Sequence, residues 1–339
     1  MTTLYFETFK QDGDTKDAAG NIVKGFRKPG FSKDNKPQQP QIVIGLMVNR
    51  NGYPLAVEMF SGATFEGHTI LPVIKNLQKK HNIETLTIVA DAGMLSLENI
   101  EKIKEAKLHY IVGARLGSIS PELLKDIAEN LNKTENQYVT SETERGTLIC
   151  DYSNKRAAKD KSDRNKQLAK AQYRIDNPEK TKRRTRFVTE ETKASLKLNE
   201  ELIAQDTLRE GVKGYYTNLK LTKEVTEKDI VARYKDLWLI EKSFRIAKSD
   251  LEARPIFHHK KESIQAHMLI IFVSLCLAKS IELKTGYSIK KVKDMIWDIL
   301  DIEFVDTLTG KKFLRRMDDS QNPMMELLQK LHVDKIPKT

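Results

Sequence analysis

The sequence contains little cysteine and no long uninterrupted apolar segment. Cys150 and Cys276 are its only two cysteines, and they lie far apart in the chain. Disulfide frameworks and thiolate zinc sites need several cysteines at short spacings, so neither is expected. The longest apolar run, residues 268–278, is too short to span a bilayer, because a spanning helix takes about 20 residues. This run predicts a helix buried in a protein core.

The first seven residues lack the basic stretch and the long apolar stretch of a signal peptide. Together with the absence of a long apolar run, this predicts a cytoplasmic protein with no membrane partner. At 339 residues the chain is long enough for one large domain or two smaller ones.

Positive charge is concentrated in one segment. The chain carries 58 Lys and Arg against 47 Asp and Glu, a net charge of +11, which favours a polyanionic partner. Residues 154–186 hold thirteen basic and four acidic side chains, a net of +9. A solvated charged helix is the usual outcome of such a run. Here the charge has one sign and one location, which favours DNA contact, because each neutralised phosphate releases counterions. The compact cluster within the segment contains the candidate DNA-binding residues Lys182, Arg183, Arg184 and Arg186.

The first 116 residues alternate between strand and helix patterns. A hairpin signal, Asn51-Gly52, separates two of the strand patterns. This order predicts an α/β fold with a mixed sheet and helices on both faces. The expected strands are 3–9, 41–48, 53–60, 85–90 and 109–114, and the expected helices are 69–81 and 97–106.

Asp91 follows the apolar, β-branched run 85–90 and precedes Gly93. The run is typical of a strand buried on both faces. Open α/β sheets place their ligand sites at the carboxyl ends of such strands. The alternative is that Asp91 caps the next helix or occupies a turn.

A second candidate site lies in the segment 234–248, which no Gly or Pro interrupts and which predicts a helix. Tyr234, Glu241 and Lys248 are seven residues apart, nearly two full turns, so they would share one face. A hydroxyl, a carboxylate and an ammonium in one stripe suit a metal ion and a phosphate backbone. The alternative is a solvated helix in which Glu241 and Arg245 form an ordinary (i, i+4) pair.

The segment resembles the Tyr-x2-Arg-x3-Glu-x6-Lys signature of bacterial insertion-sequence DDE transposases of the insertion-sequence-four branch. Leu237 stands where that signature has Arg. Trp238, Glu241, Phe244 and Arg245 are similar to a Trp-x-x-Glu-x-x-Phe-Arg run in some sub-branches. Val-Ala-Asp-Ala-Gly-Met around Asp91 resembles the motif of the family's second catalytic acid. The loop 30–34 with 40–41 resembles a Gly-Tyr-Ser-Lys-Asp…Pro-Gln segment of the same family.

The resemblance implies a ribonuclease-H-like core that transposes DNA by metal-dependent strand cleavage and transfer. Three carboxylates would hold two Mg²⁺ ions, for which Mn²⁺ can substitute. Asp91 and Glu241 would be two of the three, both catalytic and metal-binding. Tyr234, Arg245 and Lys248 would bind DNA. The implied partners are the inverted-repeat ends, the target DNA and a second copy in a homodimer, at the nucleoid.

The resemblance also implies a domain organisation. The core consists of two parts of the sequence, and a partly β, basic insertion domain separates them. The strand patterns 146–153 and 214–219 flank the basic segment. The expected divisions are 1–116 and 227–285 for the core, 117–226 for the insertion domain and 286–339 for a helical tail.

The family's first catalytic acid belongs to a motif resembling Asp-x-Thr-Thr-Leu-Tyr-Phe, and this chain reads Met1-Thr2-Thr3-Leu4-Tyr5-Phe6. The acid would fall immediately before Met1. Glu7 is no substitute, because seven residues along a strand place it on the other face and roughly 23 Å away. The resemblance therefore implies a truncated, catalytically incomplete copy that does not cleave DNA. Two alternatives remain open: a non-catalytic DNA-binding remnant or inhibitor, and a ribonuclease-H-like nuclease of different purpose.

Overall fold

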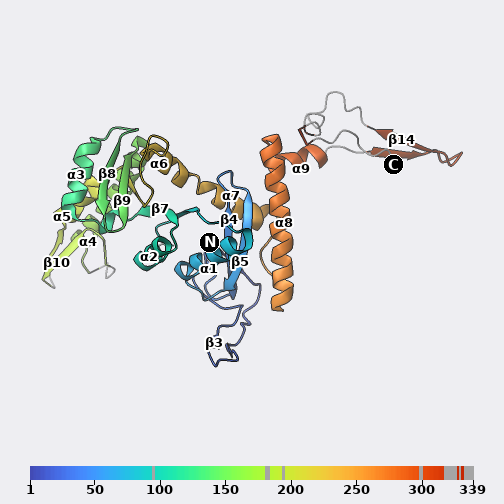
Figure 1. Cartoon of the computed structure of the whole chain (residues 1–339), viewed down its shortest axis with the longest axis horizontal. Helices are drawn as coiled ribbons and strands as arrows, with labels where there is room; N and C mark the ends of the chain where they lie inside the picture. Colours follow the sequence, from blue (N-terminus) through green and yellow to red (C-terminus); the bar gives the residue numbers. More distant parts are fainter. Residues whose placement is uncertain are drawn as a thin grey trace. The chain divides into compact units, whose positions relative to one another are not determined.

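The computed structural model describes residues 1–93, 96–179, 184–192, 195–297, 301–316, 327 and 330–331. The chain divides into two compact units (Figure 1). The first unit joins the two ends of the chain, Met1–Thr69 and Trp238–Thr339. The second unit is the continuous stretch Ile70–Leu237. Each unit has a sheet of its own.

The first unit is built on a three-stranded antiparallel sheet in the order β1-β4-β5. Its strands are β1 (Thr2–Tyr5), β4 (Gln41–Val48) and β5 (Pro54–Ser61). The turn between β4 and β5 contains Gly52 at φ +76°, whose N–H donates to the Asn49 carbonyl at 2.9 Å. A positive φ is readily adopted by glycine. The Asn51-Gly52 hairpin predicted from the sequence is therefore confirmed.

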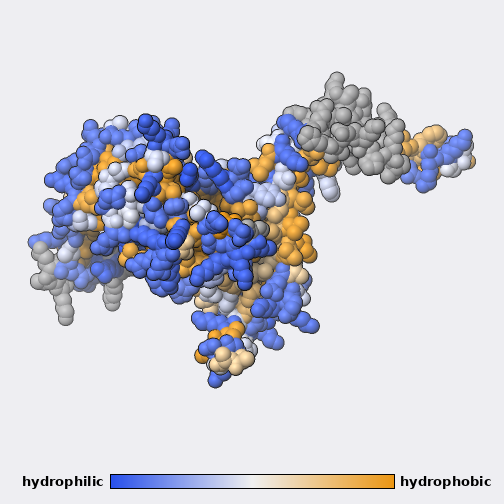
Figure 2. All heavy atoms as spheres, in the orientation of Figure 1, coloured by the Kyte–Doolittle hydropathy of each residue, from blue (hydrophilic) through white to orange (hydrophobic). Residues whose placement is uncertain are grey.

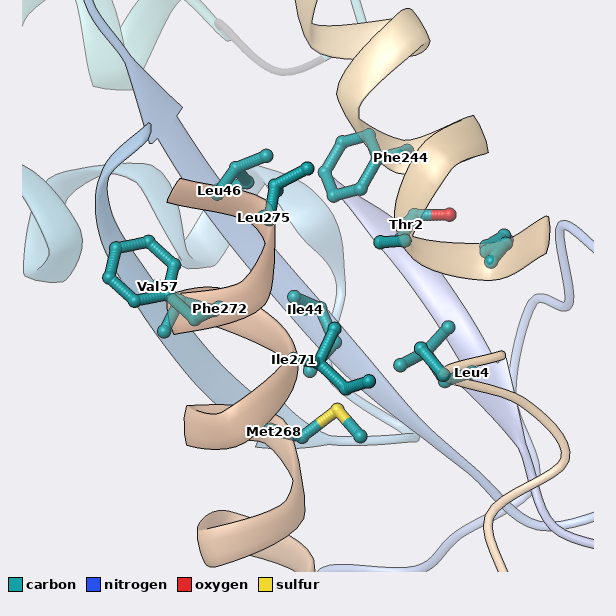
Figure 3. Close-up of a pocket in the computed structure, with 13 residues that line it drawn as sticks. Thr2, Leu4, Ile44, Leu46, Val57, Phe244, Met268, Ile271, Phe272 and Leu275 are labelled. Atoms are coloured by element: carbon teal, nitrogen blue, oxygen red, sulfur yellow. The ribbon is translucent and has the colours of Figure 1, made fainter. Parts of the chain in front are cut away.

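One long helix, α8 (Lys261–Thr285), covers a face of this sheet. Figure 3 shows Leu4 and Ile44 of the sheet pointing toward Met268 and Ile271 of α8. A cavity of about 40 Å³ lies among these side chains, with an almost entirely apolar lining. A buried water needs two or more polar partners, so this lining favours a dry cavity.

The outer face of α8 is not covered by the described residues of its own unit. Leu269, Ile270, Val273 and Leu277 are each at least 50 % exposed, and Figure 2 shows hydrophobic residues along the helix. The prediction of a buried helix at 268–278 therefore holds for one face only. By length and composition alone α8 could also cross a bilayer, a property that core helices share. The other elements of the unit are β2 (Thr15–Lys16), β3 (Ile22–Val23), a 3₁₀ turn (Glu66–His68), α9 (Ile289–Trp297), β13 (Asp301–Val305) and β14 (Lys312–Arg316).

The second unit is built on a five-stranded sheet in the order β6-β7-β12-β9-β8. β6 and β7 run parallel and every other pair is antiparallel, so the sheet is mixed. The strands are β6 (Thr87–Ala90), β7 (His109–Ala114), β8 (Tyr138–Thr143), β9 (Gly146–Tyr152) and β12 (Val212–Thr217).

Alternating side chains along these strands form two different cores. Tyr110, Leu148 and Tyr216 pack on one face mainly against three helices. Ile111 and Tyr215 pack on the other face against a fourth helix. A mixed α/β sheet with helices on both faces is thus confirmed, and the ribonuclease-H-like assignment stays a prediction. The three helices are α1 (Ile70–His81), α2 (Leu97–Glu105) and α3 (Pro121–Leu131), and the fourth is α6 (Glu227–Lys235).

The basic segment lies between two strands of the same sheet. β9 precedes it, β12 follows it, and these strands pair with each other while β12 also pairs with β7. Its main element is α4 (Asn154–Asp176), followed by β10 (Val188–Thr192), β11 (Ser195–Leu198) and α5 (Glu200–Leu208). The domain boundaries given above stay predictions.

The helix predicted across 234–248 is not continuous. α6 begins with the expected polar entry, where Thr226 and Asp229 form a capping box. It ends at Lys235, and Asp236 and Leu237 form a turn before α7 (Trp238–Arg245). A π-helical turn, Ile246–Asp250, follows. Tyr234, Glu241 and Lys248 therefore do not share the face of one helix, which corrects the prediction.

Tertiary packing explains this break, because the sequence contains no Gly or Pro there. Ile230 and Val231 of α6 pack in the core of the second unit. Ile246 and Phe244 pack in cores of the first unit. Packing of this kind overrides weak local helix propensity.

Candidate functional site

Asp91 lies at the carboxyl end of β6, as the sequence predicted, and its side chain is exposed. Its Oδ1 accepts the N–H of Ala92 at 2.7 Å. α2 is capped by Ser96, whose hydroxyl accepts the Asn99 N–H. The alternative that Asp91 caps this helix is therefore wrong, whereas the alternative of a turn residue stays open, because Ala92 and Gly93 form a turn. Its carboxylate stands at the edge of the sheet, open to a ligand.

Tyr234 contacts Asp91 within the second unit. The phenolic hydroxyl donates to Asp91 Oδ1 at 3.4 Å, a long hydrogen bond. The Tyr234 side chain is only 7 % exposed, and its ring packs edge-to-face on Tyr215 with the centroids 4.9 Å apart. Gly113 of β7 lies beneath the hydroxyl, so the phenol can approach the strand. The signature tyrosine thus supports one of the two candidate acids.

Replacing Gly113 by Ala should move Tyr234 away from Asp91. A Cβ at Gly113 would lie 2.5 Å from the phenolic oxygen, so the buried ring must shift. We expect a loss of unfolding free energy of about 1 kcal/mol, the lower end for overpacking. Urea denaturation measures it, with Gly117→Ala as the control, because a Cβ there meets nothing within 4 Å. Equal stability of the two variants would contradict the proposed clash.

Two charged residues that the sequence did not single out lie beside Tyr234 and its neighbour Tyr215. The Lys213 ammonium sits 4.4 Å from the Tyr234 ring centroid and 5.5 Å from that of Tyr215. Burial lowers the pKa of Lys213. Asp151 of β9 is buried, accepts the Tyr215 hydroxyl at 3.2 Å and forms an ion pair with Lys235 at 3.4 Å. The sequence signal that could have identified Lys213 and Asp151 is that each is a charged residue within an otherwise apolar strand pattern.

Glu241 and Arg245 lie on α7, and both side chains are exposed. The neighbouring Lys242 turns toward α8, where its ammonium pairs with Glu282 at 3.1 Å. Among the residues that the structure describes, Glu241 and Arg245 form no ion pair, although they are spaced for one. The structure therefore does not show the alternative in which Glu241 and Arg245 form an ordinary (i, i+4) ion pair.

Lys248 is held inside the first unit by Asp34. The ammonium bonds to Asp34 Oδ1 at 3.0 Å, and Arg254 reaches the same oxygen at 2.5 Å. Only 12 % of the Lys248 side chain and 6 % of the Asp34 side chain are exposed. Burial lowers the pKa of Lys248, and Asp34 opposes that effect. The resemblance assigned Lys248 to DNA, but in this structure its ammonium is committed to a carboxylate.

The loop containing Asp34 has a structural role that the sequence did not reveal. Gly30 packs so closely that a Cβ would lie 2.1 Å from the Gly62 carbonyl oxygen. Lys33 pairs with Glu66 at 2.7 Å. The segment 30–34, which local patterns describe as a simple turn, therefore positions Lys248 and Arg254.

Several arginines of the basic segment are engaged within the second unit. Arg164 pairs with Glu210, and Arg174 with Glu190, each at 2.6 Å. Of the four candidate residues in the cluster, Arg186 pairs with Asp206 and Arg184 is exposed. The other two, Lys182 and Arg183, lie outside the described residues.

The exposed cations of the basic segment lie mainly on α4. Five lysines of this helix are exposed, and its buried residues include Ala157 and Ala171. Figure 2 shows hydrophilic residues over much of this unit. The five are Lys155, Lys159, Lys161, Lys166 and Lys170.

The two candidate acids belong to different units, Asp91 to the second and Glu241 to the first. Within the described ranges, no group of three or more His, Cys, Asp or Glu side chains is placed to hold a metal ion. A shared metal site therefore stays a prediction.

Comparisons with known proteins give a family and a weak structural likeness. Residues 14–277 match the family model described as a transposase DDE domain. Among solved structures, the chain is similar to the cryo-EM structure of the piggyBac transposase synaptic complex with hairpin DNA, at 11 % identity and a TM-score of 0.39. That alignment covers 75 % of this chain and 43 % of that one, so the chain spans less than half of its length. The curated proteins contain no match.

Proposed function

Because the chain belongs to the transposase DDE domain family, we propose that it acts on DNA as a transposase of the insertion-sequence-four type. The single observation that supports a site on this chain is the contact between Tyr234 and Asp91. It joins the tyrosine of the signature to the acid of the second motif, although 143 residues separate them. The ribonuclease-H-like core and the insertion domain are parts of the same proposal.

Asp91 and Glu241 are the residues that we assign to Mg²⁺. Both are exposed carboxylates, the donor type that Mg²⁺ prefers. Held by these residues, Mg²⁺ would supply charge stabilisation for the attacking and leaving oxygens of a phosphodiester. Tyr234 holds Asp91 through its hydroxyl, and the packing of α7 on α8 through Lys242 fixes the helix that bears Glu241.

DNA is the partner that we assign to the basic segment. Exposed lysines of α4 and the exposed Arg184 provide a mainly basic surface. From the sequence, we assign the cluster residues Lys182 and Arg183 to the same partner. Such a surface binds the backbone without reading bases, so recognition of inverted-repeat ends would need further contacts. Arg245, exposed on α7, is assigned to the same partner. A homodimer on the DNA at the nucleoid completes the proposal.

Replacing Asp91 by Asn or Glu241 by Gln should weaken Mn²⁺ binding about tenfold, since each removes one anionic ligand. If both bind the same ion, the effects of the two substitutions should not add independently, because they act on one site. Isothermal titration with Mn²⁺ in the presence of duplex DNA measures this. Glu262→Gln, an exposed acid of the first unit, is the matched control.

The outcomes separate the proposal from its alternatives. Wild-type affinity in both variants would exclude the metal site and leave a DNA-binding remnant. Metal-dependent cleavage of DNA that lacks any inverted repeat would favour a nuclease of different purpose. Strand transfer that needs both the metal and the inverted repeat supports the transposase, and it would contradict the expectation of a catalytically incomplete copy.

A further inference from the structure

One sheet face of the second unit carries a charged patch beside Asp91. On the face covered by α6, Lys213 of β12 and Asp151 of β9 are directly opposite each other as cross-strand partners. The residues two positions along, Tyr215 and Ile149, are fully buried apolar neighbours on the same face. The patch therefore begins where the apolar core under α6 ends.

Three cations gather there from three different elements. Lys213 comes from β12, Lys235 from the last turn of α6 and Arg156 from the first turn of α4. Arg156 and Lys235 both lower the pKa of Lys213 by charge repulsion, after the larger effect of burial. Asp151 is the buried carboxylate among them and offsets a single positive charge.

The second anion that acts on Lys213 is Asp91. In the proposed function the Asp91 carboxylate is a metal ligand, so its charge is already neutralised. The three cations then exceed their neighbouring anion, Asp151, by two charges. An anion that enters the patch would reduce this repulsion.

Lys213 has hydrogen-bonding capacity for such an anion. Within the part of the chain that the structure describes, its ammonium lies over two aromatic rings and forms no hydrogen bond or ion pair. An ammonium has three donors, and aromatic faces attract its charge without accepting conventional hydrogen bonds. A phosphate oxygen is a strong acceptor for Lys and Arg donors.

We infer that Lys213, Arg156 and Lys235 bind one backbone phosphate of the DNA strand that is held at Asp91. Tyr234 connects the two positions, because Lys213 covers its ring while its hydroxyl donates to Asp91. The inference rests on the proposed function, since it takes DNA as the partner and Asp91 as a metal ligand. It assigns to three residues outside the signature a role in placing the strand.

The Lys213→Met variant keeps an unbranched side chain over the two aromatic rings and removes one positive charge. Combining it with Arg156→Gln gives the double variant, which lacks a second positive charge. The probe is a fluorescein-labelled DNA duplex, whose affinity is measured by fluorescence anisotropy over a range of salt concentrations. Lys213→Met should weaken binding several-fold. The double variant should lower the salt slope by about 0.9, the contribution of one phosphate. Lys125→Met is the matched control, because this exposed lysine lies on α3 and leaves the patch intact.

Three results are distinguishable. If the wild type binds DNA and the slope of the double variant falls by about 0.9 while the control is unchanged, the phosphate site is supported. If the wild type binds but the double variant keeps its affinity and slope, the inference fails and the proposed function stands. If the wild type binds no DNA at any salt concentration, both fail.

Discussion

Replacing Lys155, Lys159, Lys166 and Lys170 together by Gln should weaken DNA binding by at least about a hundredfold and flatten its salt dependence. Four phosphate contacts contribute roughly 3.6 to the slope of log K against log salt, about 0.9 each. The spacings of 4, 7 and 4 residues keep the four lysines within about 60° of one another on a helix of 3.6 residues per turn. Ala157 and Ala171 of the same helix are buried, so the lysine stripe faces away from the core.

The stripe also has a length that suits a nucleic acid. From Lys155 to Lys170 it extends roughly 22 Å at 1.5 Å per residue, so it would contact several phosphates along one strand or groove edge. Arg164 and Arg174 of the same helix are committed to Glu210 and Glu190, and they are left unchanged so that the fold is preserved.

The control removes the same number of charges from the other unit. Lys284, Lys290, Lys291 and Lys293 are exposed, and their replacement by Gln should have a much smaller effect. Fluorescence anisotropy at several salt concentrations measures both variants. Equal slopes for the two sets would mean that α4 is a solvated charged helix and that the DNA lies elsewhere.

Asp34→Asn should lower the free energy of unfolding by about 3 kcal/mol at neutral pH, because it leaves buried positive charge without its partner. Lys248 and Arg254 both bond to Asp34, and the Lys248 side chain is nearly as buried as Asp34 itself. Asp14→Asn is the control, since its partner Lys28 pairs with it near the surface. Surface pairs contribute up to about 1 kcal/mol. Urea denaturation measures both.

The loss should also depend on pH, in a direction set by Lys248. Burial already holds its pKa below the usual value in the folded protein, and Asp34 opposes this. Without Asp34 the pKa falls further, so between the folded and unfolded values the unfolded chain binds more protons, and stability rises with pH. The deficit of Asp34→Asn should therefore shrink as pH rises from 7 toward about 10. A deficit that is constant over this range would mean that Lys248 is not the destabilised group.

The elements that could be predicted are those with strong local signals. The Asn51-Gly52 turn fixed the β4–β5 hairpin, and the apolar runs around 87–114 specified β6, α2 and the parallel strand β7. The placement of Asp91 at a strand end followed from the same pattern. Such signals work because turn chemistry and side-chain periodicity act over a few residues.

The features that could not be predicted depend on distant contacts. The break at Asp236 and Leu237 follows from packing on two separate cores, which no local pattern encodes. Asp34 and Lys248 meet across 214 residues. Lys213 and Asp151 become neighbours only through the pairing of β12 with β9. The sequence indicated only that each of these two charged residues lies in an apolar strand pattern. A strand pattern alone does not predict which strands will pair.

The second unit is continuous in the sequence and lies between the two segments of the first unit. This arrangement sets an order for folding during protein synthesis. The sheet strands β1, β4 and β5 are made first, but their covering helix α8 comes from the far end of the chain. Between them lies the whole second unit, about 170 residues, which a ribosome takes roughly 10 to 30 s to produce. During that interval the second unit can fold by itself, while the apolar face of the first sheet stays uncovered. We therefore expect nascent chains arrested before α8 to bind chaperones through residues 1–69, and chains arrested after α8 to release them.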